Sequence, residues 1–271
     1  MAQLERGTAS AIAYDHSPPT GGPDAVTFVF INPITGDKGQ WEALIAPRVR
    51  SAGHGTLAYN LRGQADSPLP VQEPLTDETI TGDLAALVEH VAPLRPVYVG
   101  LSIGGLFAAR AILGGAPAAG LVLLNTLRAP SKTLDWTNEA ILRAAQLGGP
   151  RLVGDLFMPM LLGPGTLADR RADALQAEPY AAAEPDDAVV RLLTAGRDSD
   201  WTLDWSQLSL PVLIVTGAQD RVFRQPNDIA ALAAMMPQAR TEELPDAGHL
   251  LQLEAPDTVA NLLLDFATAL T

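Results

Sequence analysis

Short apolar runs alternate with longer amphipathic segments along most of the chain. Six runs are strongly apolar and are bounded largely by Gly, Pro or Asn; they cover residues 10–14, 26–31, 56–60, 97–101, 121–125 and 212–216. A seventh, more polar run covers residues 240–244. Continuous apolar runs of this length are typical of strands that are buried on both faces, as in a parallel sheet. We therefore expect an α/β fold in which a mostly parallel sheet is flanked by helices.

Two of the intervening segments show the periodicity of an amphipathic helix. In the first, the apolar positions that share one helical face are Ile80, Leu84, Leu87, Val88 and Val91. Thr76 or Asp77 can cap this helix, and Pro93 ends it. In the second, which Pro256 opens, the apolar face consists of Val259, Leu262, Leu263, Phe266 and Leu270. Both patterns predict helices that pack against the sheet.

The alternation of strands and helices stops between residues 127 and 203. This stretch has helical patterns, breaks at Pro and Gly, and two tryptophans, Trp136 and Trp201, but no strand-like run. It predicts a helical cap inserted into one core, with residues 1–126 before it and residues 204–271 after it. A chain of 271 residues is long for one domain and short for two, which fits this organisation.

Composition and charge narrow the classes of function. The net charge of −13 makes the chain a poor candidate for binding nucleic acid or an anionic membrane, because both need clustered basic residues. The absence of cysteine excludes disulfides, thiolate metal sites and a cysteine nucleophile. The N-terminus lacks the pattern of a signal peptide, and no apolar run reaches the length of a membrane span. We therefore expect a soluble cytoplasmic protein.

The segment around Ser102 has the strongest pattern for chemistry. A strand-like run ends at Leu101, Ser102 follows, and a helical pattern begins at once, so residues 100–104 form a G-x-S-x-G motif. A serine in such a tight turn has strained dihedral angles and an exposed Oγ, and the two glycines avoid collisions of Cβ atoms. The helix N-terminus also directs free N–H groups at the site. Ser102 is therefore the candidate nucleophile, with a plain turn serine as the alternative.

A serine nucleophile needs a general base, and the chain has four histidines. His16 lies in a Pro-rich N-terminal segment, His54 in a connection before a strand, and His90 in a helix. His249 follows the last predicted strand, at the carboxyl end where sites form in parallel sheets. His249 is therefore the candidate base.

The base needs an acid that orients it. Asp220 lies just beyond the run 212–216, again at the carboxyl end of a predicted strand. Asp246 competes for this role, but it lies very close to His249 in the sequence. The order Ser102, Asp220, His249 along the chain is that of the α/β-hydrolases.

With these residues identified, the chain resembles the α/β-hydrolase superfamily over essentially its whole length. The resemblance is carried by "GLSIGG", "GAQDRVF", "DAGHLLQLEAP" and "AYNLRGQADSP". The segment "LVLLNT" before a cap that contains a Trp is similar to 3-oxoadipate enol-lactonases and their esterase relatives. The resemblance implies the α/β-hydrolase fold, with a helical cap inserted after the strand that follows the nucleophile helix. It also implies a serine hydrolase that needs no cofactor and no metal.

One departure from the family lies in the turn after the third strand. The family usually has D-x-R-G-x-G-x-S, whereas this chain has Asn60 in place of the first Asp and keeps Arg62, Gly63 and Ser67. We expect this departure to have a structural effect, since the turn is mainly scaffold.

A second departure affects the oxyanion hole that the resemblance implies. Most members have His-Gly where this chain has Asn32-Pro33. Pro33 has no N–H and restricts Asn32 to extended dihedral angles. The two backbone donors are therefore expected to be Ile103, which follows the nucleophile, and Ile34, or failing that Thr35.

The resemblance implies a small-molecule ester or lactone as the substrate. Residues of the cap that could line an apolar pocket are Trp136, Phe157, Met158, Met160 and Trp201. The amide of Asn32 could hydrogen-bond either the oxyanion loop or the substrate. No cluster of Arg is available for a dicarboxylate, and Arg128 is a single candidate at the cap entrance. The oligomeric state cannot be predicted from these patterns.

Other activities are compatible with the same residues. One alternative is hydrolysis of a carbon–carbon bond in a vinylogous diketone, and another is a cofactor-free perhydrolase reaction. A third alternative is a non-catalytic binding protein on the same fold. Members with an aspartate nucleophile are disfavoured because position 102 is Ser.

Overall fold

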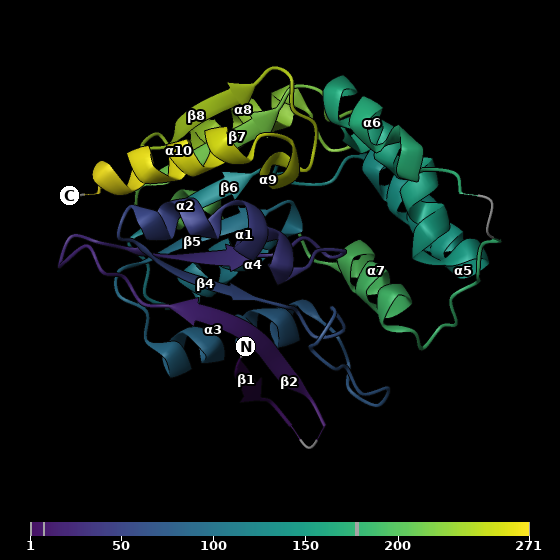
Figure 1. The fold of residues 1–271 in the computed structure, drawn as a ribbon, viewed down its shortest axis with the longest axis horizontal. Coiled ribbons are helices and arrows are strands. Elements are labelled where there is room, and N and C mark those ends of the chain that lie inside the picture. Colours follow the sequence, from purple (N-terminus) through teal and green to yellow (C-terminus); the bar gives the residue numbers. More distant parts are fainter. Residues whose placement is uncertain (1, 8, 177–178, 271) are drawn as a thin grey trace.

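The computed structural model describes residues 2–7, 9–176 and 179–270 and has one eight-stranded sheet at its centre (Figure 1). In spatial order, the strands are β1 (Ala2–Glu5), β2 (Ala11–Ser17), β4 (Gly55–Tyr59), β3 (Thr27–Ile31), β5 (Pro96–Leu101), β6 (Gly120–Leu124), β7 (Val212–Gly217) and β8 (Arg240–Leu244). β2 is antiparallel to β1 and β4, and all pairings from β4 to β8 are parallel. The mostly parallel sheet is therefore confirmed. β1 was not predicted, because its four residues are largely exposed and polar.

Helices cover both faces of the sheet. One face packs against α1 (Lys38–Leu44), α2 (Ala46–Ser51), α9 (Leu251–Glu254) and α10 (Pro256–Thr268). The other packs against α3 (Asp77–Val91), α4 (Ile103–Leu113), α8 (Pro226–Met235) and the 3-10 turn η2 (Trp205–Gln207). No helix in the described part of the chain combines the length and apolar character that a bilayer crossing requires.

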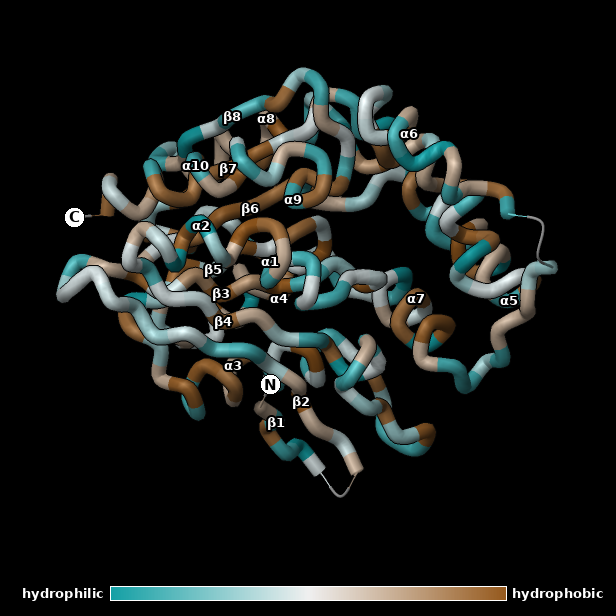
Figure 2. The backbone as a smooth tube through the Cα atoms, in the orientation of Figure 1, coloured by the Kyte–Doolittle hydropathy of each residue, from teal (hydrophilic) through white to brown (hydrophobic). Residues whose placement is uncertain are grey.

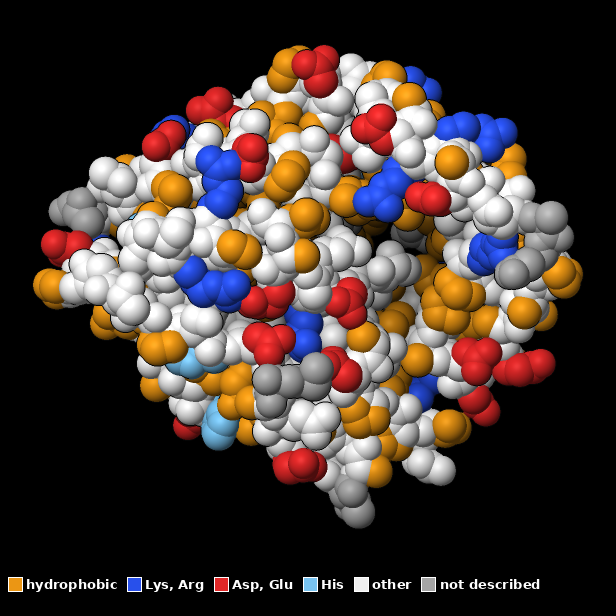
Figure 3. Space-filling model, in the orientation of Figure 1, with side chains coloured by type: hydrophobic (Ala, Val, Ile, Leu, Met, Phe, Trp, Pro, Cys, Tyr) orange, Lys and Arg blue, Asp and Glu red, His pale blue; other side chains and the backbone are white. Residues whose placement is uncertain are grey.

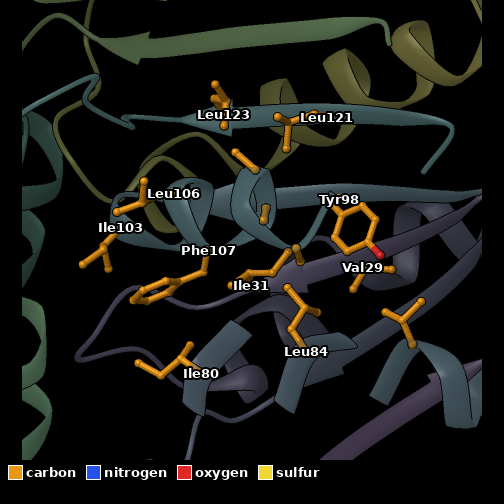
Figure 4. Packing of buried hydrophobic residues seen from close by; sticks show 14 of the residues in the cluster. Val29, Ile31, Ile80, Leu84, Tyr98, Ile103, Leu106, Phe107, Leu121 and Leu123 are labelled. Atoms are coloured by element: carbon orange, nitrogen blue, oxygen red, sulfur yellow. The ribbon is translucent and has the colours of Figure 1, made fainter. Parts of the chain in front are cut away.

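Alternating side chains of the strands divide the core into two layers. Val29 of β3 pairs in register with Tyr98 of β5, and both belong to the layer beneath α3 and α4. Their neighbours Phe30 and Val99 belong to the opposite layer. This follows from the two-residue period of a strand, and it explains why the central strands are apolar throughout (Figure 2). Figure 4 shows Leu84 of α3 directed toward the side chains of the sheet and α4.

The segment between β6 and β7 is helical. It contains α5 (Lys132–Leu161), α6 (Pro164–Arg170), the turn η1 (Arg171–Asp173) and α7 (Ala188–Asp198), and it lies at one side of the molecule (Figure 1). α5 is broken at Gly148 and Gly149, and Gly149 has a φ of 68°, which favours glycine. The Arg191 guanidinium of α7 donates to backbone carbonyls of residues 69–73 and so fastens this helix to the core. We refer to residues 127–203 as the cap.

Candidate active site

Ser102 stands at a strained turn between β5 and α4. Its φ of 57° and ψ of −127° lie outside the regions that residues with a side chain normally adopt. A Cβ atom on Gly100 would lie 2.4 Å from the nitrogen of Gly105, and one on Gly104 would lie 2.6 Å from the carbonyl oxygen of Ile31. Only glycine fits at these two positions, so the motif allows the backbone contacts that the sharp turn requires.

Asp220 and His249 form a buried pair. Asp220 Oδ2 lies 2.6 Å from His249 Nδ1, and both side chains are almost inaccessible to solvent. Asp220 Oδ1 accepts hydrogen bonds from the N–H groups of Val222 and Phe223. Burial by itself raises the pKa of Asp220, but His249 and the two N–H groups outweigh it and hold the pKa below its ordinary value of 3.8. Asp246, the competing carboxylate, is exposed.

Asn125 holds the loop that carries His249, and sequence reasoning missed it. Its Nδ2 donates to the carbonyls of Gly248 (3.0 Å) and His249 (2.8 Å), and its Oδ1 accepts from the N–H of Gly217 (2.8 Å). The N–H of His249 in turn donates to the carbonyl of Leu161, at the end of α5. The only sign of this role in the sequence is a polar residue at the carboxyl end of a buried strand. The φ of 47° that Asn125 adopts is seen only in the structure.

A cavity of about 460 Å³ lies between the core and the cap, and both Ser102 and His249 line it. On the face shown in Figure 3, the surface is hollowed between the cap and the core. Ser102 Oγ makes no hydrogen bond to another described residue. Nucleophile and base often come into hydrogen-bond contact only when a substrate is bound. The cavity therefore joins the predicted nucleophile to the predicted base.

The structure brings some of the predicted lining residues to this cavity and excludes others. Phe157, Met158 and Trp201 line it. The prediction for Trp136 is wrong, because this side chain is 80% exposed on the outer side of α5 and does not line the cavity. The prediction that Asn32 lines the substrate site is also wrong, because its amide is fully buried and hydrogen-bonded to the Tyr59 carbonyl and to Trp41 Nε1. The prediction for Met160 is wrong as well, because this residue does not line the cavity.

Two arginines of this region, Arg128 and Arg197, are paired with carboxylates. Arg128, the candidate for a substrate carboxylate, lies 3.1 Å from Asp228 and does not line the cavity. Arg197 lines the cavity, but its guanidinium lies 2.7 Å from Asp198 and 3.6 Å from Glu139. Both charges are thus balanced by carboxylates of the protein.

Backbone N–H groups on two sides of the cavity have no acceptor in the described part of the chain. They belong to Ile103, the first residue of α4, and to Ile34 and Thr35 in the loop after β3. The first N–H groups of a helix have no partner within the helix and attract negative charge. Among the described residues, no group of three or more His, Cys, Asp and Glu side chains could hold a metal ion. The arrangement can therefore bind a developing oxyanion through backbone donors.

Both the sequence and the fold of this chain are similar to those of known proteins. A sequence model described as the alpha/beta hydrolase family matches residues 28–262. Three solved structures are similar. The first is an alpha/beta hydrolase enzyme from a Medee basin deep-sea metagenome library, with a TM-score of 0.83 and 20% identity over 98% of this chain and 96% of that one. The second is a thermophilic esterase from Thermogutta terrifontis, with a TM-score of 0.80 and 22% identity over 100% of this chain and 99% of that one. The third is the enol-lactonase from Burkholderia xenovorans, with a TM-score of 0.77 and 23% identity over 96% of this chain and 98% of that one. At these identities the structural likeness shows the fold.

Proposed function

Because the chain belongs to the alpha/beta hydrolase family, we propose that it is a serine hydrolase which cleaves a small-to-medium carboxylic ester or lactone through an acyl-enzyme. The observation that carries the proposal is the buried contact of 2.6 Å between Asp220 and His249, next to the cavity that Ser102 lines. An esterase and an enol-lactonase among the similar structures agree with this class of reaction.

The proposed reaction begins with attack of Ser102 Oγ on the acyl carbon. His249 takes the serine proton on Nε2 and gives it to the leaving oxygen when the ester bond breaks. Asp220 keeps the other proton on Nδ1 and stabilises the imidazolium that forms. Water, deprotonated by His249, then releases the acid and restores Ser102. The net change is addition of one water to one ester bond.

The negative oxygen of the tetrahedral intermediate would be bound by backbone N–H groups. Ile103 supplies one donor, and Ile34 or Thr35 supplies the other, since none of the three has an acceptor among the described residues. Donors that are already in place cost no reorganisation during the reaction, and each is worth roughly 3 kcal/mol.

The cavity favours a substrate with a neutral, apolar acyl part. Its walls are formed largely by aliphatic and aromatic side chains, including Leu134, Ile141, Val153, Phe157, Leu192 and Trp201. The one arginine among its lining residues, Arg197, already has two carboxylate partners. A substrate carboxylate would therefore be buried without a free cation, which costs several kcal/mol.

A substrate panel tests the proposal. We expect hydrolysis of p-nitrophenyl esters with short to medium acyl chains or of lactones, with the Ser102→Ala variant at least about 10³-fold slower. Dicarboxylate half-esters should be poor substrates. Turnover only on vinylogous diketones, or only in peroxide-dependent reactions, would replace ester hydrolysis with one of the alternative reactions on the same residues.

A further inference from the structure

We propose that Gln64 is a positioning residue that sets the orientation of the oxyanion loop, residues 32–36; this inference rests on the function proposed above. Gln64 lies in the turn after β4, and its side chain is buried. Its Nε2 donates to two consecutive carbonyls of the loop, those of Pro33 (2.7 Å) and Ile34 (2.9 Å). One amide group from a distant turn therefore holds two neighbouring peptide groups.

The direction of these two carbonyls fixes the direction of the next two N–H groups. The chain has no cis peptide bond in its described part, and in a trans peptide the C=O and the following N–H point in opposite directions. Because the Pro33 carbonyl faces Gln64, the Ile34 N–H faces away from it. Because the Ile34 carbonyl also faces Gln64, the Thr35 N–H faces away from Gln64 as well. These are the two loop donors without an acceptor among the described residues.

Gln64 acts through the loop and not on the substrate, although it borders the cavity. Its Oε1 accepts from Asn32 Nδ2 and from the N–H of Leu61, both at 2.9 Å, while its NH₂ serves the two carbonyls. A primary amide offers two donors and two acceptor lone pairs, so all of its hydrogen-bonding capacity is used. No polar atom remains for a substrate.

The two departures from the family sequence meet in this network. Asn32 Nδ2 lies 3.1 Å from Asn60 Oδ1, and Asn32 Oδ1 accepts from Trp41 Nε1 at 2.8 Å. Pro33 has no N–H through which the loop could be anchored, so its carbonyl is the backbone group that remains for this purpose. Gln64 and Asn32 together therefore hold the entry of the loop by side-chain hydrogen bonds.

Two substitutions separate the roles of the amide. Gln64→Met keeps the approximate shape and removes every hydrogen bond. Gln64→Glu keeps an acceptor for Asn32 and Leu61 and replaces the NH₂ donor with a carboxyl oxygen that faces the two carbonyls. It therefore provides the test if Gln64→Met does not fold. The control is Gln238→Met, since the amide of Gln238, an exposed residue, also donates to two carbonyls, those of Leu208 and Leu210, and does not line the cavity.

Three measurements decide the proposal: steady-state kinetics on the best ester, inhibition by a trifluoromethyl ketone of the same acyl chain, and amide hydrogen exchange of Gly36, whose N–H donates to the Pro33 carbonyl. We expect kcat/KM and trifluoromethyl ketone affinity to fall together by about 10- to 100-fold in both Gln64 variants, with KM changed less than about threefold and exchange accelerated. Gln238→Met should match the wild type. Unchanged kcat, or a rise in KM alone, would overturn the positioning role.

The inference and the proposed function fail in different ways. A wild-type protein that neither turns over esters nor binds the trifluoromethyl ketone refutes the hydrolase proposal. In that case hydrogen exchange still decides whether Gln64 holds the loop, and unchanged exchange in Gln64→Met would refute it. An active wild type with equally active Gln64 variants refutes only the positioning role.

Discussion

Replacement of Asp220 by Asn is the perturbation whose consequence follows most directly from the geometry. Asp220 Oδ1 accepts from two backbone N–H groups, so the remaining oxygen of the new amide will occupy that position and its NH₂ will face His249. An NH₂ group can only donate, which forces Nδ1 to accept and leaves the proton on Nε2. In that tautomer His249 cannot take the proton of Ser102.

The expected loss is large because the pair is buried. The contact of 2.6 Å between Asp220 and His249 is a charge-assisted bond between two side chains that are almost inaccessible to solvent, and no other described carboxylate contacts the imidazole. We expect kcat to fall by about 10³- to 10⁴-fold, which corresponds to about 4–5.5 kcal/mol in the activation free energy.

The assay is steady-state hydrolysis of a p-nitrophenyl ester at neutral pH, with circular dichroism to establish that the variant is folded. Asp246→Asn is the matched control, since Asp246 is the exposed aspartate nearest to His249 in the sequence and should leave kcat unchanged. A loss of less than tenfold in Asp220→Asn, or an equal loss in both variants, would refute the assigned role of Asp220.

Three further predictions concern packing, the cap and pH. Gly104→Ala should lower the free energy of unfolding in urea by about 1–3 kcal/mol and reduce kcat, because the new methyl would collide with backbone oxygens at the end of β3. Gly82→Ala is the control, because a methyl there meets no atom, and its free energy of unfolding in urea should be unchanged or higher. Trp201→Ala should raise KM, because Trp201 lines the cavity. Trp136→Ala should leave KM unchanged and alter the free energy of unfolding by less than about 0.5 kcal/mol, because Trp136 is exposed. An equal rise in KM for both variants would contradict the orientation of the cap helices. The pKa of Asp220 is lower in the folded chain than the ordinary 3.8, so its carboxylate stabilises the fold above that pH, and this contribution is lost as the pH falls through the folded-state pKa. Chemical denaturation between about pH 5 and pH 3 should therefore show a steeper loss of stability in the wild type than in Asp220→Asn, and parallel curves would contradict the lowered pKa.

Much of the fold could be predicted because its signals are local. The runs that became β3, β5, β6 and β7 are apolar at nearly every position, which only burial on both faces explains. The motif around Ser102 combines the end of such a run, two glycines and the start of a helix within a few residues. β1 lacked such a signal, because a short exposed edge strand is held by pairing with β2 and not by its own composition.

The environment of the site could be predicted only in part because it depends on contacts distant in the sequence. Gln64 and Pro33 are 31 residues apart, and Asn125 and Gly248 are 123 apart, so nothing near either amide indicates its partner. Trp136 and Trp201 look equivalent in the sequence. Which one faces the cavity is decided by how the cap helices pack, including the break in α5, and that geometry has no local pattern.

The central claim is that Ser102 is a nucleophile activated by His249, and active-site labelling tests it most directly. The protein would be treated with a fluorophosphonate probe, digested, and analysed by mass spectrometry to locate the modified residue. We predict one equivalent of label on Ser102, no label in Ser102→Ala, and labelling slowed by at least about 100-fold in His249→Ala. A folded wild-type protein that takes up no label, or takes it up at another serine, would contradict the account and favour a binding protein on a hydrolase fold.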